Sequence, residues 1–312
     1  KQKTAYEMLR SLVGSEMCIR DRYAGWGGLS DVFDLVSSMN SAAMVRRQEI
    51  LRELLTEKEY EQVRKTTLTS FYTPPQVISF MYDALVKMGF TGGRVLDPAL
   101  GIGHFIGMMP NEMRTASSFL GVEIDPISQR IAKLLYPNQK TVNSPFEKIQ
   151  LPPGYSDLVI TNVPFGHYTV SDVKYNPHNL YIHDYFISKS LDLVRDGGIV
   201  AVITSSSTMD GAANHGREVI FGKADLLAAV RLPDDVFKGT GTRVTTDILF
   251  LKKNSNKKLD DAKQFNDTVE LQLKTKNERY VYAAINKYFA DNPDMVVGSI
   301  CLLYTSPSPR DS

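Results

Sequence analysis

Cysteine is almost missing from this chain of 312 residues, and the two that occur, Cys18 and Cys301, lie near its ends. Residues 19–300 therefore contain none, which excludes a disulfide framework and a cysteine metal site there. The five histidines are dispersed without the spacing of metal ligands, so no metal site is predicted. Uninterrupted apolar runs of about 20 residues, the length that crosses a membrane, are missing as well. These absences predict a soluble protein without a structural metal.

An excess of charge of one sign is also missing. The chain has 36 basic and 35 acidic residues, which gives a formal net charge of +1. Bulk charge therefore provides no steering towards nucleic acid, and a nucleic-acid-binding face would have to come from local clustering of basic residues.

The two ends of the chain are related to each other through the genetic code. One DNA sequence encodes Ser11–Asp21, and its complementary strand in a shifted frame encodes Cys301–Asp311. That DNA resembles a transposase-type sequencing-library adapter, so residues 1–22 and 301–312 are predicted to be adapter-derived tails and are left out of fold reasoning. The natural sequence is then expected to run from about residue 23 to residue 300, as an internal fragment of a longer protein. Without the tails the formal net charge becomes −1.

The remaining sequence predicts helices first and then an alternation of strands and helices. Residues 23–65 form the predicted N-terminal helical segment, in which Thr56–Glu59 is a candidate helix start. The apolar runs beyond residue 66 predict strands at Arg94–Leu96, Phe119–Glu123, Leu158–Ile160, Ile199–Ile203, Leu226–Leu232 and Asp247–Leu251. Helical spacing predicts helices at Ser128–Tyr136, Tyr185–Val194 (ending at Asp196–Gly198) and Tyr280–Asp291 (stopped by Pro293). Strands separated by helices indicate an α/β protein with a mostly parallel sheet covered on both faces, and Asp247–Leu251 is expected to be a hairpin partner near an edge.

A glycine loop follows the first predicted strand. Asp97 ends that strand, and the chain then turns through Gly101 and Gly103 into a helix. Glycines allow the backbone angles of such a turn and let the main chain approach a ligand closely. The start of the helix adds oriented N–H donors. The loop is therefore a candidate site for an adenosine-containing cofactor, although glycine turns of this kind are common and the spacing is not that of a dinucleotide-binding loop.

The second predicted strand ends in an acidic residue, Glu123. It lies about twenty positions after the glycine loop, where a carboxylate can accept both hydroxyls of a ribose. Asp125 is instead expected to cap the next helix, whose first residue would be Pro126.

The third predicted strand ends in Asn162-Val163-Pro164-Phe165. An aromatic amine is a poor nucleophile because its lone pair is conjugated into the ring. The Asn162 amide oxygen and the Val163 carbonyl can accept its two hydrogens, shift the nitrogen towards sp³ and free the lone pair for an electrophilic methyl group. Pro164 fixes the backbone and has no N–H to compete for the acceptors. Phe165 offers a face on which a base can stack, worth about 1–3 kcal/mol.

These motifs together resemble the adenine-specific amino-group DNA methyltransferases, and most closely the methylase segments of large methylase–helicase proteins of plasmids, phages and conjugative elements. The resemblance covers about Trp26 to Gly298 and implies a Rossmann-like methyltransferase fold with a mostly parallel seven-stranded sheet. It implies S-adenosyl-L-methionine as cofactor and Asn162, Val163, Pro164 and Phe165 as catalytic residues. The implied cofactor-binding residues are Tyr72, Thr73, Pro74, Asp97, Ala99, Gly101, Gly103, Phe105, Glu123, Ile124 and Phe146.

Two positions depart from the family pattern. Ser144-Pro145-Phe146 stands where the family usually has an Asp and an aromatic residue near the cofactor adenine, so the aromatic is present and the Asp is absent. Val163 replaces the first proline of the catalytic motif, but a main-chain carbonyl remains at that position. Residues 232–250, including Phe237 and the loop Gly239–Thr242, resemble the segment that shapes the target-base pocket.

The resemblance implies methylation of an adenine flipped out of DNA, in the cytoplasm of a bacterial or phage-infected cell, by part of a mobile-element protein with a downstream helicase region. RNA or protein glutamine as substrate, and a degenerate module that only binds cofactor or DNA, remain as alternatives. The expected organisation is a helical segment at 23–65, a catalytic domain at 66–253 and, at 254–300, a linker with the start of a following region. Tyr168, Tyr175 and Tyr181 interleave with basic residues in the loop after the catalytic motif, which is either a nucleotide contact or a solvated loop.

Overall fold

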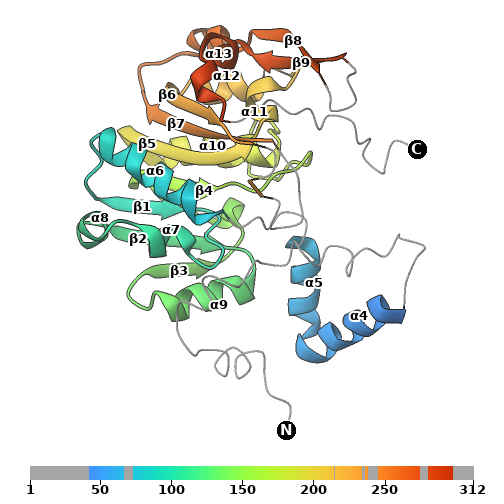
Figure 1. The fold of residues 1–312 in the computed structure, drawn as a ribbon. Coiled ribbons are helices and arrows are strands. Elements are labelled where there is room, and N and C mark those ends of the chain that lie inside the picture. The colour runs from blue at the N-terminus through green and yellow to red at the C-terminus, as the bar shows by residue number, and fades with distance from the viewer. Residues whose placement is uncertain are drawn as a thin grey trace.

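The computed structural model describes residues 42–66, 73–213, 215–233, 236–237, 245–274 and 280–297. Its centre is a seven-stranded sheet with the order β3-β2-β1-β4-β5-β7-β6 (Figure 1). The strands are β1 (Arg94–Asp97), β2 (Ser118–Glu123), β3 (Lys140–Asn143), β4 (Ser156–Asn162), β5 (Val194–Ser205), β6 (Ala224–Arg231) and β7 (Thr246–Lys253). Strand β7 runs antiparallel to both of its neighbours, β5 and β6, and the other strand pairs are parallel. The predicted fold class, a mostly parallel seven-stranded sheet, is confirmed.

Helices cover both faces of this sheet (Figure 1). One face, which includes Leu96, Val159 and Val200, packs against helices on the side of α10 and α12. The opposite face, which includes Val95 and Leu158, packs against α6 and α7. The larger helices are α6 (Pro75–Lys87), α9 (Pro126–Leu135), α10 (Ile182–Leu193) and α12 (His215–Phe221), and the short ones are α7 (His104–Met108), α8 (Asn111–Thr115) and α11 (Ser207–Asp210). Strands buried on both faces have continuous apolar sequences, which is why they were visible in the sequence.

The N-terminal helices α4 (Ala42–Leu54) and α5 (Glu57–Thr66) pack on the edge of the domain at α9. The predicted start at Thr56–Glu59 is confirmed by a reciprocal cap. The Thr56 N–H donates to the Glu59 carboxylate (2.9 Å), and the Glu59 N–H donates to the Thr56 hydroxyl (3.3 Å). This cap fixes where α5 begins, and Tyr60 and Val63 of the same helix are buried against α9.

The structure differs from the sequence analysis at three elements. The first concerns the break expected at Asp196–Gly198, because β5 already begins at Val194 and runs through it. The β4–β5 register shifts between Ser156 and Leu158, so the extra residues are accommodated as an irregularity in the ladder. Gly197 has φ +71°, and a side chain at Gly198 would lie 2.9 Å from the Asp157 carbonyl oxygen. Gly197 and Gly198 therefore allow a bulge within β5, and they do not mark the end of a helix.

The second difference concerns β3, which the sequence did not predict. This edge strand, Lys140-Thr141-Val142-Asn143, is mostly polar and nowhere fully buried. It pairs in parallel with β2, so its partner determines its conformation and no apolar pattern marks it.

The third difference is a correction and concerns Tyr280–Asp291, for which a helix was predicted. Residues 280–286 form strand β9 (Tyr280–Asn286), paired antiparallel with β8 (Thr268–Lys274), and only α13 (Lys287–Asp291) is helical. The aromatic and β-branched residues of this segment suit a strand once a partner strand is present. Asn286 ends the strand and caps α13 by accepting from the Tyr288 N–H (3.0 Å).

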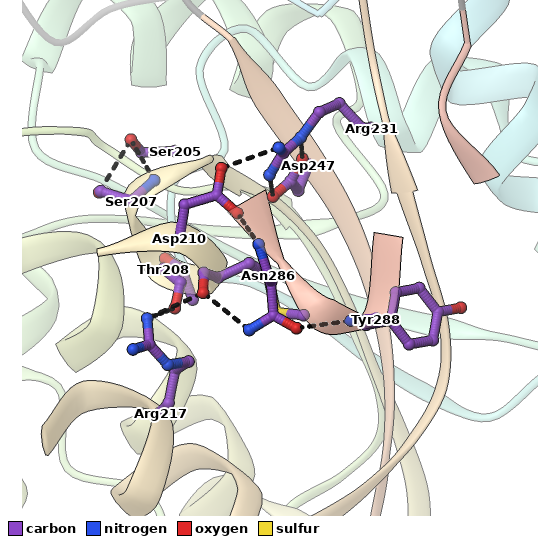
Figure 2. Close-up of polar contacts among 10 residues, drawn as sticks. Ser205, Ser207, Thr208, Asp210, Arg217, Arg231, Asp247, Asn286 and Tyr288 are labelled. Carbon is purple, nitrogen blue, oxygen red and sulfur yellow. Dashed lines mark hydrogen bonds and ion pairs between the residues drawn. The ribbon is translucent and has the colours of Figure 1, made fainter. Parts of the chain in front are cut away.

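A buried polar network fastens the β8–β9 hairpin to the central sheet (Figure 2). The Arg231 guanidinium donates to both oxygens of Asp247 (2.8 and 2.9 Å) and forms an ion pair with Asp210 (2.8 Å). Asp210 accepts from the Asn286 N–H (2.8 Å), and the Asn286 amide donates to the carbonyls of Met209 (2.9 Å) and Phe265 (2.8 Å). Strands β6, β7 and β9 and helix α11 therefore meet at one buried cluster.

In the segment 254–300, where a linker and the start of a following region were expected, the chain forms the 3₁₀ helices η4 (Leu259–Phe265) and η5 (Pro293–Met295). A third 3₁₀ helix, η2 (Phe146–Lys148), lies earlier in the chain. The proposed domain boundaries remain predictions. Trp26, Tyr72 and the loop Gly239–Thr242 lie outside the described residues. In the described ranges no helix has both the length and the apolar character that membrane crossing requires.

Candidate active site

The glycine loop between β1 and α7 has backbone angles that suit only glycine. Gly101 has φ +56° and Gly103, which precedes α7, has φ +86°. Both lie in the left-handed region, which is strained for other residues. A side chain on Gly103 would also lie 2.7 Å from the ring of Tyr136. The chain therefore needs glycine at these positions in order to turn sharply at the carboxyl end of β1.

Glu123 connects the end of β2 to this loop. One carboxylate oxygen accepts from the Gly101 N–H and the other accepts from the Asp125 N–H, both at 2.7 Å. Asp125 itself caps α9, as predicted, by accepting from the N–H groups of Ile127 (3.2 Å) and Ser128 (3.1 Å). The two acidic residues thus have different roles: Asp125 caps α9, and Glu123 accepts a hydrogen bond from the main chain of the glycine loop.

The pKa values of the two carboxylates at the loop, Asp97 and Glu123, are raised. Burial raises the pKa of Asp97 to about 7, although its hydrogen bond from the Ala99 N–H (3.1 Å) favours the charged form. Burial also raises the pKa of Glu123 to about 7, and the negative charges of Asp125 and Asp97 add to the effect. Carboxylates whose pKa is raised by desolvation in this way mark candidate functional sites.

A cavity of about 520 Å³ opens beside the loop. Its volume is in the range of small-molecule sites. Nine of the residues predicted from the sequence line it: Thr73, Ala99, Gly101, Phe105, Glu123, Ile124, Phe146, Asn162 and Pro164. The glycine loop and the end of β4 are about sixty residues apart in the sequence, and the parallel sheet brings both to the same cavity because β1 and β4 are neighbours.

The other predicted residues do not line this cavity. Asp97 is fully buried beneath it, and Val163 is buried, with its N–H donating to the Ile203 carbonyl (3.1 Å). Phe165 is partly buried where the two main core clusters meet. Pro74 precedes α6 and Gly103 precedes α7, so both shape the walls through the backbone. Tyr72 lies outside the described residues.

Several cavity residues were not predicted as site residues. Tyr168 and Val170 come from the loop after the catalytic motif, and Ile182 and Phe186 come from α10. The ring centroids of Phe186 and Phe146 are 4.9 Å apart, so α10 supports the aromatic residue of the 144–148 segment. No local pattern distinguishes these side chains from ordinary core residues of a buried helix.

A buried lysine fixes the same segment from below. Lys189 of α10 is fully buried, and its ammonium donates to the Phe146 carbonyl (2.8 Å) and to Asp172 (2.9 Å). Asp172 also accepts from the Tyr185 hydroxyl (2.7 Å). Burial lowers the pKa of Lys189, while Asp172 raises it and so favours the charged form. Lys189 therefore ties the loop after β4 to the cavity wall at Phe146.

The strand order, the glycine loop and the acid at the end of β2 define the class of S-adenosylmethionine-dependent methyltransferases. Within that class, the sequence profile of the N-6 DNA methylase family matches residues 53–290. The chain belongs to this family, whose cofactor is S-adenosyl-L-methionine.

Individual proteins resemble this chain in sequence or in fold. The chain is 28% identical over 230 residues to "Defense against restriction protein B" of Escherichia phage P1, an alignment that covers 71% of this chain and 10% of that protein. It thus spans about a tenth of that relative's length. Among solved structures, a class I S-adenosylmethionine-dependent methyltransferase of Listeria monocytogenes has a TM-score of 0.51 at 14% identity, covering 80% of this chain and 88% of that one. A type I restriction enzyme modification subunit of Vibrio vulnificus has a TM-score of 0.50 at 18% identity, covering 82% and 58%. Both show similarity of fold.

Proposed function

We propose that this chain transfers a methyl group from S-adenosyl-L-methionine to the exocyclic amine of an adenine that is flipped out of DNA. The observation that carries the proposal is that Asn162 and Pro164 line the same cavity as Gly101 and Glu123. The proposed acceptor for an amine and the proposed site for a ribose thus line one cavity, as a transfer between two ligands requires. Family membership supports the same reaction.

The cofactor-binding role is assigned to the loop and to Glu123. The carboxylate of Glu123 lines the cavity and is the group proposed to accept the ribose hydroxyls. Ile124 and Pro164 provide apolar surface on which the adenine ring of the cofactor can lie, next to Phe146. Bound there, the cofactor supplies the electrophilic methyl group.

The catalytic role is assigned to the end of β4. The Asn162 amide oxygen and the Val163 carbonyl are proposed to accept the two hydrogens of the target amine, with Phe165 stacking on the base. These groups hold the amine so that its lone pair points at the methyl group. They act by positioning the substrate and by preorganised electrostatics. A valine in place of the first proline keeps the required carbonyl, because that group belongs to the main chain.

The proposal extends to the biological setting. The phage P1 relative is named for defence against restriction, which supports a role in modifying the DNA of a mobile element so that host restriction enzymes spare it. On this proposal the chain is part of a much longer protein with a downstream helicase region and acts in the cytoplasm.

The test is methyl transfer from labelled cofactor to DNA. We expect Asn162→Ala to lower the rate by about 100-fold or more, as loss of one preorganised polar group does elsewhere. Asn111→Ala, on the exposed helix α8, is the matched control and should keep the wild-type rate. Equal rates for Asn162→Ala and wild type would refute the assigned role. Transfer to RNA or to a protein glutamine in preference to DNA would refute the substrate.

A second candidate function is a module that binds the cofactor but does not react. The departures at Val163 and Ser144 from the family pattern favour it. Calorimetric binding of S-adenosylhomocysteine together with no turnover on any DNA would support this alternative.

A further inference from the structure

The N-terminal helix α5 packs on the glycine loop through apolar side chains. Tyr60 and Val63 of α5 are buried in one cluster with Ile102, the residue between the two loop glycines. Only 1% of Ile102 is exposed, so the cluster covers the side chain of the loop. Ile127, in the first turn of α9, belongs to the same cluster. The position of α5 is therefore set by the loop and by the start of α9.

An ion pair holds the same face of α5 against α9. The Glu59 carboxylate accepts from the Arg130 guanidinium of α9 at 2.8 Å. Side chains three and four positions apart lie on one face of a helix. Gln62 and Val63 therefore share with Glu59 the face of α5 that is turned towards α9 and the glycine loop.

Gln62 is the residue through which α5 reaches the cavity. Among the described residues that precede Thr73, it alone lines the cavity. Gly101 of the loop and Ser128 of the first turn of α9 line the cavity as well, and α5 packs on both of these segments. Because the Gly101 N–H donates to the Glu123 carboxylate, Gln62 enters the cavity on the side of Glu123.

The amide of Gln62 complements the carboxylate of Glu123 chemically. A ribose hydroxyl has one hydrogen to donate and lone pairs that accept. An ionised carboxylate only accepts, so a hydroxyl that donates to Glu123 still needs a donor for its own oxygen. The side-chain amide of Gln62 has two N–H donors. A ligand oxygen left without a donor in a partly buried site costs binding free energy.

We propose that Gln62 is a further cofactor-binding residue, whose amide N–H group donates to a ribose hydroxyl that itself donates to Glu123. This inference rests on the proposed function, because it assumes that the cofactor occupies this cavity with its ribose at Glu123. The helical segment at 23–65, predicted as separate from the catalytic domain, then supplies a part of the cofactor site through α5.

The experiment measures calorimetric binding of two ligands to the full chain at pH 8. One is S-adenosylhomocysteine, and the other is its analogue that lacks both ribose hydroxyls. We expect the wild type to bind the analogue at least about tenfold more weakly, because the analogue loses its hydrogen bonds to Glu123 and Gln62. Gln62→Ala should bind S-adenosylhomocysteine about threefold to tenfold more weakly and the analogue as the wild type does. The ratio of the two affinities should fall by the same factor.

A second variant tests the donor itself. Gln62→Glu keeps the size of the side chain and an acceptor oxygen, but it removes both N–H donors. It should lower the ratio at least as much as Gln62→Ala does. A merely structural role for Gln62 would change the affinities for both ligands together and leave their ratio as in the wild type, so the ratio is the decisive quantity.

Two control variants should keep the wild-type ratio. Lys58→Ala changes an exposed position of the same helix, and Gln264→Ala removes an exposed glutamine on η4. Neither residue lines the cavity.

The outcomes separate this inference from the function on which it rests. If the wild type prefers S-adenosylhomocysteine and Gln62→Ala keeps the wild-type ratio, the role of Gln62 is overturned and the proposed function stands. If Gln62→Glu keeps the wild-type ratio, the amide is not the donor and the inference is again overturned. If the wild type binds neither ligand, the proposed function is overturned together with this inference.

Discussion

Two groups of buried or half-buried carboxylates, one at the glycine loop and one around Arg231, are stabilised in different ways. At the glycine loop, Asp97 and Glu123 accept main-chain N–H groups, and in the described part of the chain neither forms an ion pair. At the other group, Asp210 and Asp247 share the guanidinium of Arg231 (Figure 2). Burial alone would lower the pKa of Arg231, but the charges of Asp247 and Asp210 raise it above its ordinary value.

The difference separates a candidate site from a structural junction. Burial raises the pKa of Asp97 and of Glu123 to about 7, and it raises that of Asp247 to about 6 against the opposing effect of Arg231. Of the two carboxylates at the loop, Glu123 lines a cavity that a ligand can enter, whereas Asp97 is fully buried next to it in the chain's interior. The carboxylates around Arg231 have their partners within the chain and hold the β8–β9 hairpin to the sheet. A buried charge therefore indicates a ligand site here only where the fold leaves its charge unbalanced.

The largest effect is expected from a substitution that breaks the ion pairs around Arg231. Arg231→Met removes the guanidinium that pairs with both Asp210 and Asp247 and leaves both carboxylates buried. We expect the free energy of unfolding to fall by about 3–5 kcal/mol, as for other broken buried ion pairs. Urea unfolding measures it. Arg114→Met, on the exposed helix α8, is the control, and a similar small change in both variants would show that the cluster contributes little.

The next effect is the pH dependence that Glu123 imposes. Its pKa is raised from 4.5 to about 7 in the folded chain, so the protonated form is favoured on folding. The stabilisation is fully present below about pH 4.5 and is lost as the pH rises through about 7. Glu123→Gln cannot titrate. We therefore expect the wild type to lose about 3 kcal/mol relative to this variant between pH 4.5 and 8.

The measurement is urea unfolding at a series of pH values. Glu112→Gln, an exposed carboxylate, serves as the control and should follow the wild-type curve. If the free energies of unfolding of the wild type and Glu123→Gln change with pH in parallel, Glu123 is well solvated. The charge at the glycine loop is then not unbalanced, and the contrast with Arg231 fails.

A smaller effect tests how the hairpin region contacts β6. The Tyr288 hydroxyl accepts from the Ala229 N–H (3.1 Å), so Tyr288→Phe leaves that main-chain donor without this partner. We expect a loss of about 1–2 kcal/mol in the free energy of unfolding. Tyr282→Phe is the control because 67% of Tyr282 is exposed, and it should change stability by less than about 0.5 kcal/mol. Equal effects in the two variants would contradict the assignment.

The smallest effect is expected for a surface ion pair. Arg195 contacts Asp157 at 2.7 Å, but the Arg195 side chain is 53% exposed. Arg195→Ala should lower the free energy of unfolding by less than about 1 kcal/mol, and this loss should vanish at high salt. The loss for Arg231→Met should persist at high salt, because buried charges are poorly screened. A salt-sensitive Arg231 effect would remove the distinction between the two pairs.

Local chemistry made most of the parallel sheet predictable. The apolar runs around Val95, Leu120 and Val159 form strands because such runs are buried on both faces. Asp125 caps α9 and Thr56 caps α5 because a cap needs only residues within three positions. The loop glycines at 101 and 103 were recognised for the same reason, since their backbone angles are decided by the turn itself.

Long-range contacts decided what the sequence did not show. The polar strand β3 exists because β2 is beside it, and the Tyr280 segment is a strand because β8 pairs with it. The cavity walls formed by Tyr168 and Phe186, and the contact of Lys189 with the Phe146 carbonyl, join residues from separate elements. No neighbouring residue in the sequence indicates such contacts.

The sequence by itself therefore determined the class of fold, the turn at the end of β1, and which residue types end β2 and β4. The tertiary structure alone decided which of those residues share a cavity, which buried charges are balanced by Arg231, and how Lys189 reaches the Phe146 carbonyl. The physical reason is the distance in sequence over which each interaction acts. Backbone angles and caps depend on residues a few positions apart, whereas desolvation and ion pairing depend on which distant segments the packed sheet brings together.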